Sequence, residues 1–257
     1  QEIQDNDGAE ISAVVDATQT YEELIDAIRQ LKGPTYAWVD IAPHADADGG
    51  QPGGNIRNGF LYNPARVALA DDSVVLLGGD DPAYEGSRKP LAARFVVRAS
   101  GAMLTVVNVH LASKRHQHSI FAAQHPGYDP KLATRVRQAE IVRALLIELA
   151  GRNEDYYVTG DFNDFEFSDT LAAMTGDESI DLVLSLPPNE RYDYNHRGKL
   201  EALMHGLVSR RQVEQGRAEY AILHGNELIG VKAGDLGSKP TDHAYVIARL
   251  QVQNSTA

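Results

Sequence analysis

Two apolar stretches of the chain end in polar side chains that are suited to phosphate chemistry. Asn108 and His110 close the stretch MLTVVNVHL, and Asp161 and Asn163 follow the stretch YYVT. Side chains at strand ends are held by a rigid sheet and face a common rim. Carboxylates, amides and imidazoles together can hold a hard divalent cation, position a water molecule and neutralise a phosphate. We therefore expect these four side chains to lie close together.

Three further polar side chains complete this set. Asp242 and His243 precede the apolar stretch AYVIARL, and Glu2 stands at the second position of the chain. Hard oxygen ligands and the absence of cysteine favour Mg²⁺ over zinc, with Mn²⁺ as an alternative. The sequence contains no Gly-rich phosphate loop and no nucleophile elbow that would point to a different reaction. The pattern predicts metal-assisted hydrolysis.

Each of these residues also has a purely structural interpretation. Asp161 and Asn163 are common turn formers after a glycine. His110 fits a buried strand histidine that bonds to the backbone, and Asp242 fits a loop cap. Glu2 fits an exposed side chain at a chain end. The functional interpretation depends on their occurring together.

The composition of the chain excludes several classes of protein. The 257 residues include 24 Lys and Arg against 36 Asp and Glu, which gives a formal net charge of −12. Such a charge argues against a broadly basic nucleic-acid coat, although a local cationic groove or a metal site can still face a polyanion. The absence of cysteine excludes disulfides, thiolate metal sites and a cysteine nucleophile. No apolar run approaches membrane-spanning length.

The chain begins QEIQDNDG, with neither a methionine nor a signal peptide. We therefore expect a single domain over residues 1–257 that lacks its N-terminal strand. Helical spacing of apolar residues predicts helices over 20–32, 132–149 and 168–174. Apolar and β-branched stretches predict strands over 35–41, 57–62, 66–69, 74–77, 91–98, 103–111, 156–159, 182–186, 203–209, 220–223 and 244–250. Many strands with few helices indicate an α+β fold with packed sheets.

Six stretches in a fixed order resemble the endonuclease/exonuclease/phosphatase superfamily, the magnesium-dependent phosphodiesterases that include DNase I and the abasic-site endonucleases. They are QEIQDNDG at 1–8, GGNIRNGFLYNPARV at 53–67, SRKPLAARF at 87–95, VVNVHLASK at 106–114, YYVTGDFND at 156–164 and PTDHAYVIA at 240–248. A run that spans almost the whole chain is far more specific than any single motif. Within the superfamily, the chain is most similar to bacterial extracellular nucleases.

The resemblance implies a four-layer α/β sandwich, with two mostly antiparallel sheets face to face and helices outside. It also implies a secreted, Mg²⁺-dependent hydrolase that acts on DNA or another phosphodiester. By the same match, Glu2 binds the metal and Asp242 lies beside metal and water. Asp161 orients or deprotonates the attacking water, Asn163 contacts the phosphate, and His243 stabilises the developing charge or transfers a proton.

Four further roles follow from the resemblance. His110 is the other imidazole of the active site, and Asn108 belongs to the substrate-binding set. Arg57 and Arg88 match basic positions that face the phosphate backbone of the substrate. Taken alone, each arginine also fits an ordinary surface position.

The chain departs from the family pattern in two places. The family has an asparagine on a strand upstream of the metal-binding glutamate, and this chain begins after it. The family also carries an aspartate that orients the catalytic histidine, and Met204 occupies its position here. A thioether accepts no strong hydrogen bond. Glu201 and His205 are the candidate substitutes.

These departures leave three functions open. The first is a nuclease that cuts DNA with little sequence preference. The second is a phosphatase or phosphodiesterase acting on lipid head groups or small phosphoesters. The third is a catalytically impaired binding relative.

Three polar segments lie outside this pattern. His44, Asp46 and Asp48 suit either a calcium ligand set or a solvated loop. The segment 114–118 suits either a contact with the DNA backbone or a loop. The segment 191–199 places Tyr192 and Tyr194 among basic residues, which suits either base stacking or a hairpin tip.

Overall fold

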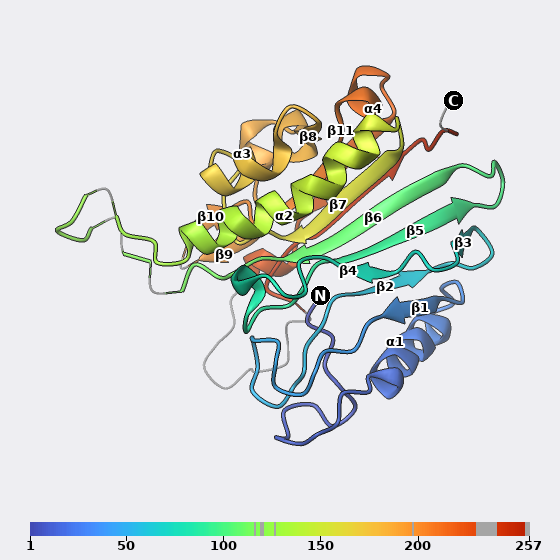
Figure 1. Ribbon diagram of the computed structural model, residues 1–257, viewed down its shortest axis with the longest axis horizontal. Helices are drawn as coiled ribbons and strands as arrows, with labels where there is room; N and C mark the ends of the chain where they lie inside the picture. The colour runs from blue at the N-terminus through green and yellow to red at the C-terminus, as the bar shows by residue number, and fades with distance from the viewer. Residues whose placement is uncertain (116, 119–120, 126, 197, 230–240, 255–257) are drawn as a thin grey trace.

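The largest element of the computed structural model is a seven-stranded sheet in the order β3-β5-β6-β7-β11-β8, with β4 paired to β5 (Figure 1). The model describes residues 1–115, 117–118, 121–125, 127–196, 198–229 and 241–254. The strands of this sheet are β3 (Val67–Leu69), β4 (Val75–Leu76), β5 (Leu91–Val97), β6 (Met103–His110), β7 (Asp155–Asp161), β8 (Ser179–Asp181) and β11 (Met204–Ser209). The pair β6–β7 is parallel, and the other pairs described in this sheet are antiparallel.

One face of this sheet is covered by α2 (Leu132–Gly151) and α3 (Asp169–Thr175) (Figure 1). The apolar residues Val107 and Val158 of the sheet form a buried core with Val142 and Leu146 of α2. The helix predicted over 132–149 is confirmed. The amphipathic spacing predicts this helix because residues three or four positions apart lie on one side of a helix, and that side packs on the sheet.

The opposite face of the sheet carries a second core. The strands β12 (Ala218–Leu223) and β13 (Tyr245–Leu250) pair with each other, and their side chains pack with Val208 and Tyr157. Tyr157 is the neighbour of Val158 in β7, and successive residues of a strand point to opposite faces. The sheet is therefore buried on both sides.

A second strand pair lies on this same face. The strands β1 (Ala37–Asp40) and β2 (Gly59–Tyr62) pair with each other, and Phe60 packs edge-on against Phe95 of β5, with ring centroids 5.8 Å apart. Helix α1 (Thr18–Gln30) lies outside this pair, where Tyr21 stacks on Trp38 at 4.4 Å. The four layers are the helices α2 and α3, the seven-stranded sheet, the two strand pairs and the helix α1. The predicted α+β sandwich is therefore confirmed.

The second sheet differs from the expectation in one respect. In the residues that the structure describes, it consists of the two separate pairs β1–β2 and β12–β13. Helix α1 also begins and ends two residues earlier than the predicted range 20–32.

The predicted strand over 182–186 is wrong. Residues Leu182–Ser185 form a 3₁₀ turn, because the Asp181 side chain accepts a hydrogen bond from the Val183 backbone and caps the turn. The short hairpin of β9 (Tyr194–His196) and β10 (Lys199–Glu201) and the helix α4 (Arg210–Glu214) complete the described strands and α-helices, and further 3₁₀ turns lie at Pro82–Tyr84, Pro188–Glu190 and Asn226–Leu228. Among the described helices, none has the length and apolarity that crossing a bilayer requires.

Candidate active site

His110 and Asp161 are the last residues of the parallel strands β6 and β7. They are register partners, and His110 Nε2 lies 3.6 Å from Asp161 Oδ2. Parallel strands bring their carboxyl ends to one edge of a sheet, so the two side chains share a rim as expected. Both side chains are largely buried, at 10% and 8% exposure.

Gly160 permits this close approach. Its φ is +139°, and a Cβ at this position would lie 1.9 Å from the Val109 carbonyl oxygen on β6. A side chain here would push the two strands apart one residue before Asp161. The glycine of the GDFN motif is therefore a geometric requirement of the site.

Asn163 holds the Asp161 carboxylate in place. Its backbone N–H donates to Asp161 Oδ1 at 2.7 Å, and its φ of +52° allows this tight turn. Its Nδ2 donates to Asp161 Oδ2 at 3.2 Å and to the Leu111 carbonyl oxygen at 3.0 Å. These two bonds use both amide hydrogens, so the predicted phosphate contact of Asn163 does not match this arrangement. The side chain instead orients Asp161.

His243 completes the group from the far end of the chain. Its Nε2 lies 3.8 Å from Asp161 Oδ2, and its Nδ1 lies 2.6 Å from Asp193 Oδ1. The Asp193 side chain is fully buried, and its other oxygen accepts hydrogen bonds from the backbone of Leu203 at 2.7 Å and of Met204 at 2.9 Å. The imidazole is thus held by a fixed carboxylate.

The predicted loss of an orienting carboxylate at Met204 is therefore wrong. Asp193 supplies it from the segment before the β9–β10 hairpin, and it reaches the start of β11 through the Met204 backbone N–H. Neither proposed substitute fills this role. His205 is fully buried elsewhere, with Nδ1 at 2.7 Å from Asp181 and Nε2 at 3.0 Å from the Asp164 carbonyl oxygen. Glu201 pairs with Tyr194 across the hairpin.

The sequence carries one signal for Asp193: a single aspartate stands between two tyrosines in the segment 191–199. A buried carboxylate in such an apolar setting needs partners. Its partner His243 is fifty positions away along the chain, so local spacing does not identify it.

Burial and the attraction between Asp161 and His243 set the protonation states of these two side chains. Burial raises the pKa of Asp161 to about 6, against the opposing pull of His243. Burial would lower the pKa of His243, but the hydrogen bond to Asp193 and the charge of Asp161 raise it to about 9. Near neutral pH the site therefore combines a carboxylate with an imidazolium.

His110 has the opposite electrostatic character. Burial and the nearby Arg88 guanidinium lower its pKa to about 2. Its buried Nδ1 has no hydrogen-bond partner among the described residues. A neutral imidazole therefore faces Asp161 on one side while a charged imidazole faces it on the other.

Glu2 and Arg88 form the rim next to His110. Arg88 Nη1 donates to Glu2 Oε1 at 2.9 Å, and the Glu2 side chain is 59% exposed. The backbone beyond Glu2 is fixed by the antiparallel bridge between Ile3 and Arg57. The Arg88 guanidinium is close enough to act electrostatically on both His110 and Asp161, and its contact with a substrate phosphate stays a prediction.

Arg57 and Asn108 do not face a substrate directly. The Arg57 side chain is buried, bonds to the carbonyl oxygens of Asn55 and Val15, and lies 3.5 Å from Asp40. Its predicted contact with the phosphate backbone is wrong, because these partners hold it in the interior. Asn108 is also buried, and its Nδ2 donates to the Gly59 carbonyl oxygen at 3.1 Å.

Glu2 and Asp242 are the carboxylates that would hold a hard cation that keeps most of its water. Among the described residues, no group of three or more His, Asp or Glu side chains converges as a metal cluster. The Oδ1 atoms of Asn58 and Asn108 are buried without a partner in that part of the chain. The Asp242 side chain is 65% exposed, and its Oδ1 lies 4.0 Å from His243 Nε2. A sparse oxygen set fits Mg²⁺, which binds through one or two carboxylates plus water and phosphate.

Buried polar residues of α2 anchor the two segments that leave the site. Arg135 Nε donates to Asp164 at 3.0 Å, and Gln138 accepts from the Ala112 backbone N–H at 2.9 Å. Lys114 Nζ reaches the same Asp164 carboxylate at 2.9 Å. The chain after His110 and the chain after Asp161 are therefore tied to one helix.

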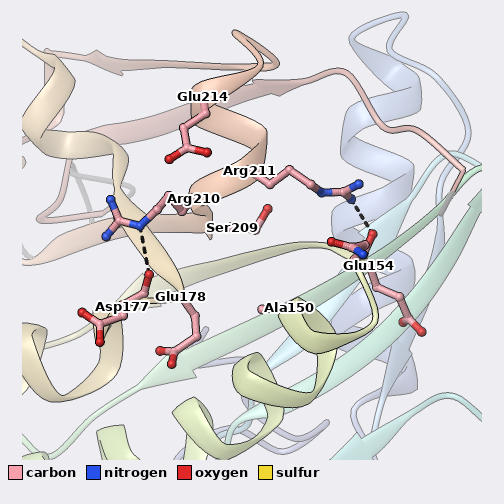
Figure 2. A pocket seen from close by; sticks show the side chains of 9 residues that line it. Ala150, Glu154, Asp177, Glu178, Ser209, Arg210, Arg211 and Glu214 are labelled. Atoms are coloured by element: carbon pink, nitrogen blue, oxygen red, sulfur yellow. Dashed lines mark hydrogen bonds between the residues drawn. The ribbon is translucent and has the colours of Figure 1, made fainter. Parts of the chain in front are cut away.

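A surface pocket of about 220 Å³ lies at the other end of β7 (Figure 2). Its lining carries both charges, and Arg210 Nε donates to the Asp177 carbonyl oxygen at 2.9 Å. None of the predicted site residues lines it; the lining residues are Ala150, Asn153, Glu154, Asp177, Glu178, Ser209, Arg210, Arg211 and Glu214. The chemistry predicted from the sequence lies at the opposite edge of the sheet.

Comparison with known proteins places this arrangement in a family. The family model described as the Endonuclease/Exonuclease/phosphatase family matches residues 1–243. No curated protein sequence gives a significant match.

Solved structures share the fold at low sequence identity. The human Nocturnin catalytic domain with a bound sulfate anion is 11% identical, with 91% of this chain and 78% of that chain covered and a TM-score of 0.60. Mannosyl-6-phosphatase Bt3783 from Bacteroides thetaiotaomicron is 15% identical, with 90% and 82% covered and a TM-score of 0.55. D. rerio TDP2 complexed with single strand DNA product is 16% identical, with 90% and 80% covered and a TM-score of 0.53.

Proposed function

Because the chain belongs to the endonuclease/exonuclease/phosphatase family and is a phosphoester hydrolase of that superfamily, we propose that it is a Mg²⁺-dependent phosphodiesterase that cuts DNA with little sequence preference. The observation that carries the proposal is the convergence of His110 and His243 on the Asp161 carboxylate, at 3.6 and 3.8 Å. The D. rerio TDP2 structure with a single strand DNA product supports DNA as the substrate, and we propose from the sequence motifs that the protein is secreted.

Asp161 acts on the attacking water. Its carboxylate is fixed by two bonds from Asn163, so it accepts a proton from a water molecule in a defined direction. His243 supplies positive charge next to the phosphate and holds a proton at Nε2 for the leaving oxygen, while Asp193 fixes its ring. Placing charge where it develops in the transition state is a large source of rate enhancement.

Glu2 would hold the metal, and Mn²⁺ suits the same oxygen set. When bound, the cation would supply positive charge for the phosphate oxygens. Arg88 pairs with the Glu2 carboxylate at 2.9 Å and contributes a second positive group at this rim. Phosphate binding by a protein with a net charge of −12 depends on such local cations.

The reason to expect an impaired relative at Met204 no longer applies, because Asp193 orients His243. A phosphatase acting on lipid head groups or small phosphoesters is an alternative within the family.

Nicking of a supercoiled plasmid, measured with Mg²⁺, with Mn²⁺ and with EDTA, tests the proposal. We expect nicking with either metal, none with EDTA, and none for Asp161→Asn. Metal-dependent hydrolysis of inositol phosphates or sugar phosphates without nicking would replace DNA with a small substrate. Binding without hydrolysis of plasmid, bis(4-nitrophenyl) phosphate or these monoesters would overturn the enzymatic assignment.

A further inference from the structure

The short β9–β10 hairpin places a row of aromatic rings beside the catalytic histidine. Tyr194 and His243 are antiparallel bridge partners, and their rings stack with centroids 4.9 Å apart and planes at 29°. Tyr194 and His196 lie two residues apart on β9, and their rings are 6.3 Å apart, also at 29°. Alternate residues of a strand share a face, so the three rings form a continuous row.

The row runs from the catalytic group to solvent. The His243 side chain is 18% exposed, Tyr194 is partly buried and His196 is exposed. Core aromatic clusters end in the interior, whereas this row presents its last ring to a molecule outside. An exposed aromatic ring beside a reaction centre is a suitable surface for another flat ring.

The same face of the hairpin also carries a cation. Lys199 is the register partner of His196 and is exposed. The Cβ atoms of cross-strand partners lie about 5 Å apart on one face, so Lys199 brings a positive charge to the face that carries the His196 ring. Glu201, the partner of Tyr194, lies at the catalytic end of this face. Aromatic rings alternating with cations are the surface that binds bases and phosphates of a single strand.

We propose that Tyr194, His196 and Lys199 form a subsite that stacks an unpaired nucleobase next to the scissile phosphate. The base lies against the outer ring row, and Lys199 neutralises the phosphate that follows it. A paired base inside a duplex is covered on both faces by its neighbours, so the subsite requires a single strand or a frayed end. This inference rests on the proposed phosphodiesterase function and names its substrate class.

A second aromatic pair follows β7. Phe165 and Phe167 stack at 5.4 Å shortly after the turn that carries Asn163, and Phe167 is 80% exposed. Lys114 Nζ lies 4.1 Å above the Phe165 ring, and its charge is paired with the Asp164 carboxylate at 2.9 Å. This pair therefore adds an exposed ring beyond the carboxyl end of β7.

The hairpin supplies its own control. Leu200 is 50% exposed and pairs with Asn195, whose side chain bonds to the Gly198 backbone within the turn. Positions 195 and 200 alternate with 194, 196 and 199, so they point to the opposite face. Leu200→Ala therefore changes an exposed side chain of the same hairpin without touching the ring row.

The first measurement detects stacking directly. A single-stranded oligonucleotide containing 2-aminopurine is titrated with the protein in EDTA, where hydrolysis is blocked. We expect fluorescence quenching with the wild type and with Leu200→Ala, and its loss with His196→Ala. Absence of quenching by the saturating wild-type protein, with binding followed by anisotropy, would overturn the subsite.

The second measurement separates stacking from a structural role of the row. With Mg²⁺, we expect His196→Ala to raise KM about tenfold for a single-stranded oligonucleotide, with kcat nearly unchanged. The rise should vanish when the stacked nucleotide is replaced by an abasic one, and the wild type should prefer single-stranded over duplex substrate. Equal effects of His196→Ala on intact and abasic strands would refute the inference, while bis(4-nitrophenyl) phosphate hydrolysis reports separately on the proposed function.

Discussion

The strand β7 begins and ends with a buried aspartate, and the two carboxylates have opposite surroundings. Asp155 is bound by Arg217 at 2.5 and 3.0 Å, by Arg211 at 2.9 Å and by the Gln253 backbone N–H at 3.1 Å. The Asp161 carboxylate receives hydrogen bonds from Asn163 alone among the described residues and faces two imidazoles beyond hydrogen-bond distance.

This difference separates structural from chemical use of a buried charge. The first carboxylate has its acceptor capacity filled by guanidinium groups, so it stabilises the fold and has nothing left for a ligand. The second is buried with partners that only partly compensate it, which is why burial raises its pKa to about 6. Incomplete compensation is costly for folding and useful for catalysis.

Replacing Asp161 should give the largest effect. We expect Asp161→Asn to lower kcat by about 10³- to 10⁴-fold, because the amide accepts no proton from water. The variant should be as stable as the wild type or more stable, since burial of the ionised carboxyl opposes folding above its raised pKa. Steady-state hydrolysis and urea unfolding check the two halves of this expectation. Unchanged turnover would remove Asp161 from the chemistry.

The matched change at the other end of the strand should do the reverse. Asp155→Asn leaves Arg217 and Arg211 without their shared counter-charge, which should cost about 3–5 kcal/mol of unfolding free energy. Turnover per folded molecule should stay the same, because the site lies at the far end of β7. A loss of kcat without a loss of stability would contradict the comparison.

Asp193 tests whether a buried carboxylate can contribute to catalysis by orienting another side chain. Asp193→Asn should lower kcat about 10²- to 10³-fold, because the His243 ring loses its charged partner and its fixed orientation. Glu190→Gln removes a half-exposed carboxylate three residues away and is the control. Circular dichroism verifies the fold, and wild-type turnover in Asp193→Asn would show that His243 needs no such support.

His205 is a buried charge near the catalytic end that resembles Asp155 in its pairing. Burial would lower its pKa, but Asp181 and the Asp164 carbonyl raise it to about 9, above the value near 6.5 of an unfolded histidine. The stabilisation is therefore complete below pH 6.5 and is lost as the pH rises through 9. It should amount to about 3 kcal/mol. Unfolding of wild type and His205→Gln at pH 6 and pH 9.5 measures it, and a stability difference that does not shrink with pH would exclude the ion pair.

The smallest effect should come from Met204→Asp. Asp193 already bonds to His243, so an aspartate at position 204 supplies no orienting partner that the imidazole lacks. We expect kcat within about twofold of the wild type, with a modest loss of stability from two adjacent carboxylates. A tenfold gain would mean that Asp193 orients the histidine poorly in solution.

Strong local patterns could be read from the sequence. The helix over 132–149 follows from apolar spacing, because it buries one side against the sheet. The hairpin over 91–111 follows from its continuous apolar stretches, because its strands belong to a sheet that is covered on both faces. The parallel pairing of β6 and β7 brings His110 and Asp161 together, as the strand-end argument expects. The turn at Leu182–Ser185 was missed, because an apolar run of that length fits a strand equally well.

Long-range partners could not be read in this way. The burial of Arg57 depends on Val15, Asn55 and Asp40, which come from three separate segments. The role of Asp193 depends on a histidine near the end of the chain. Motif matching assigns roles by position, whereas here the orienting carboxylate comes from a different segment and reaches the same place.

The parallel register of β6 and β7 has a consequence for how the enzyme acquires activity during folding. The strands β6 and β7 are joined through residues 111–154, which include the whole of α2, whereas the β5–β6 hairpin closes locally. Closing a long loop costs entropy before its contacts form, so distant pairings arise late. In refolding experiments, secondary structure should therefore return before hydrolysis does. Nascent or partly folded chains would be inert until the crossover helix has docked.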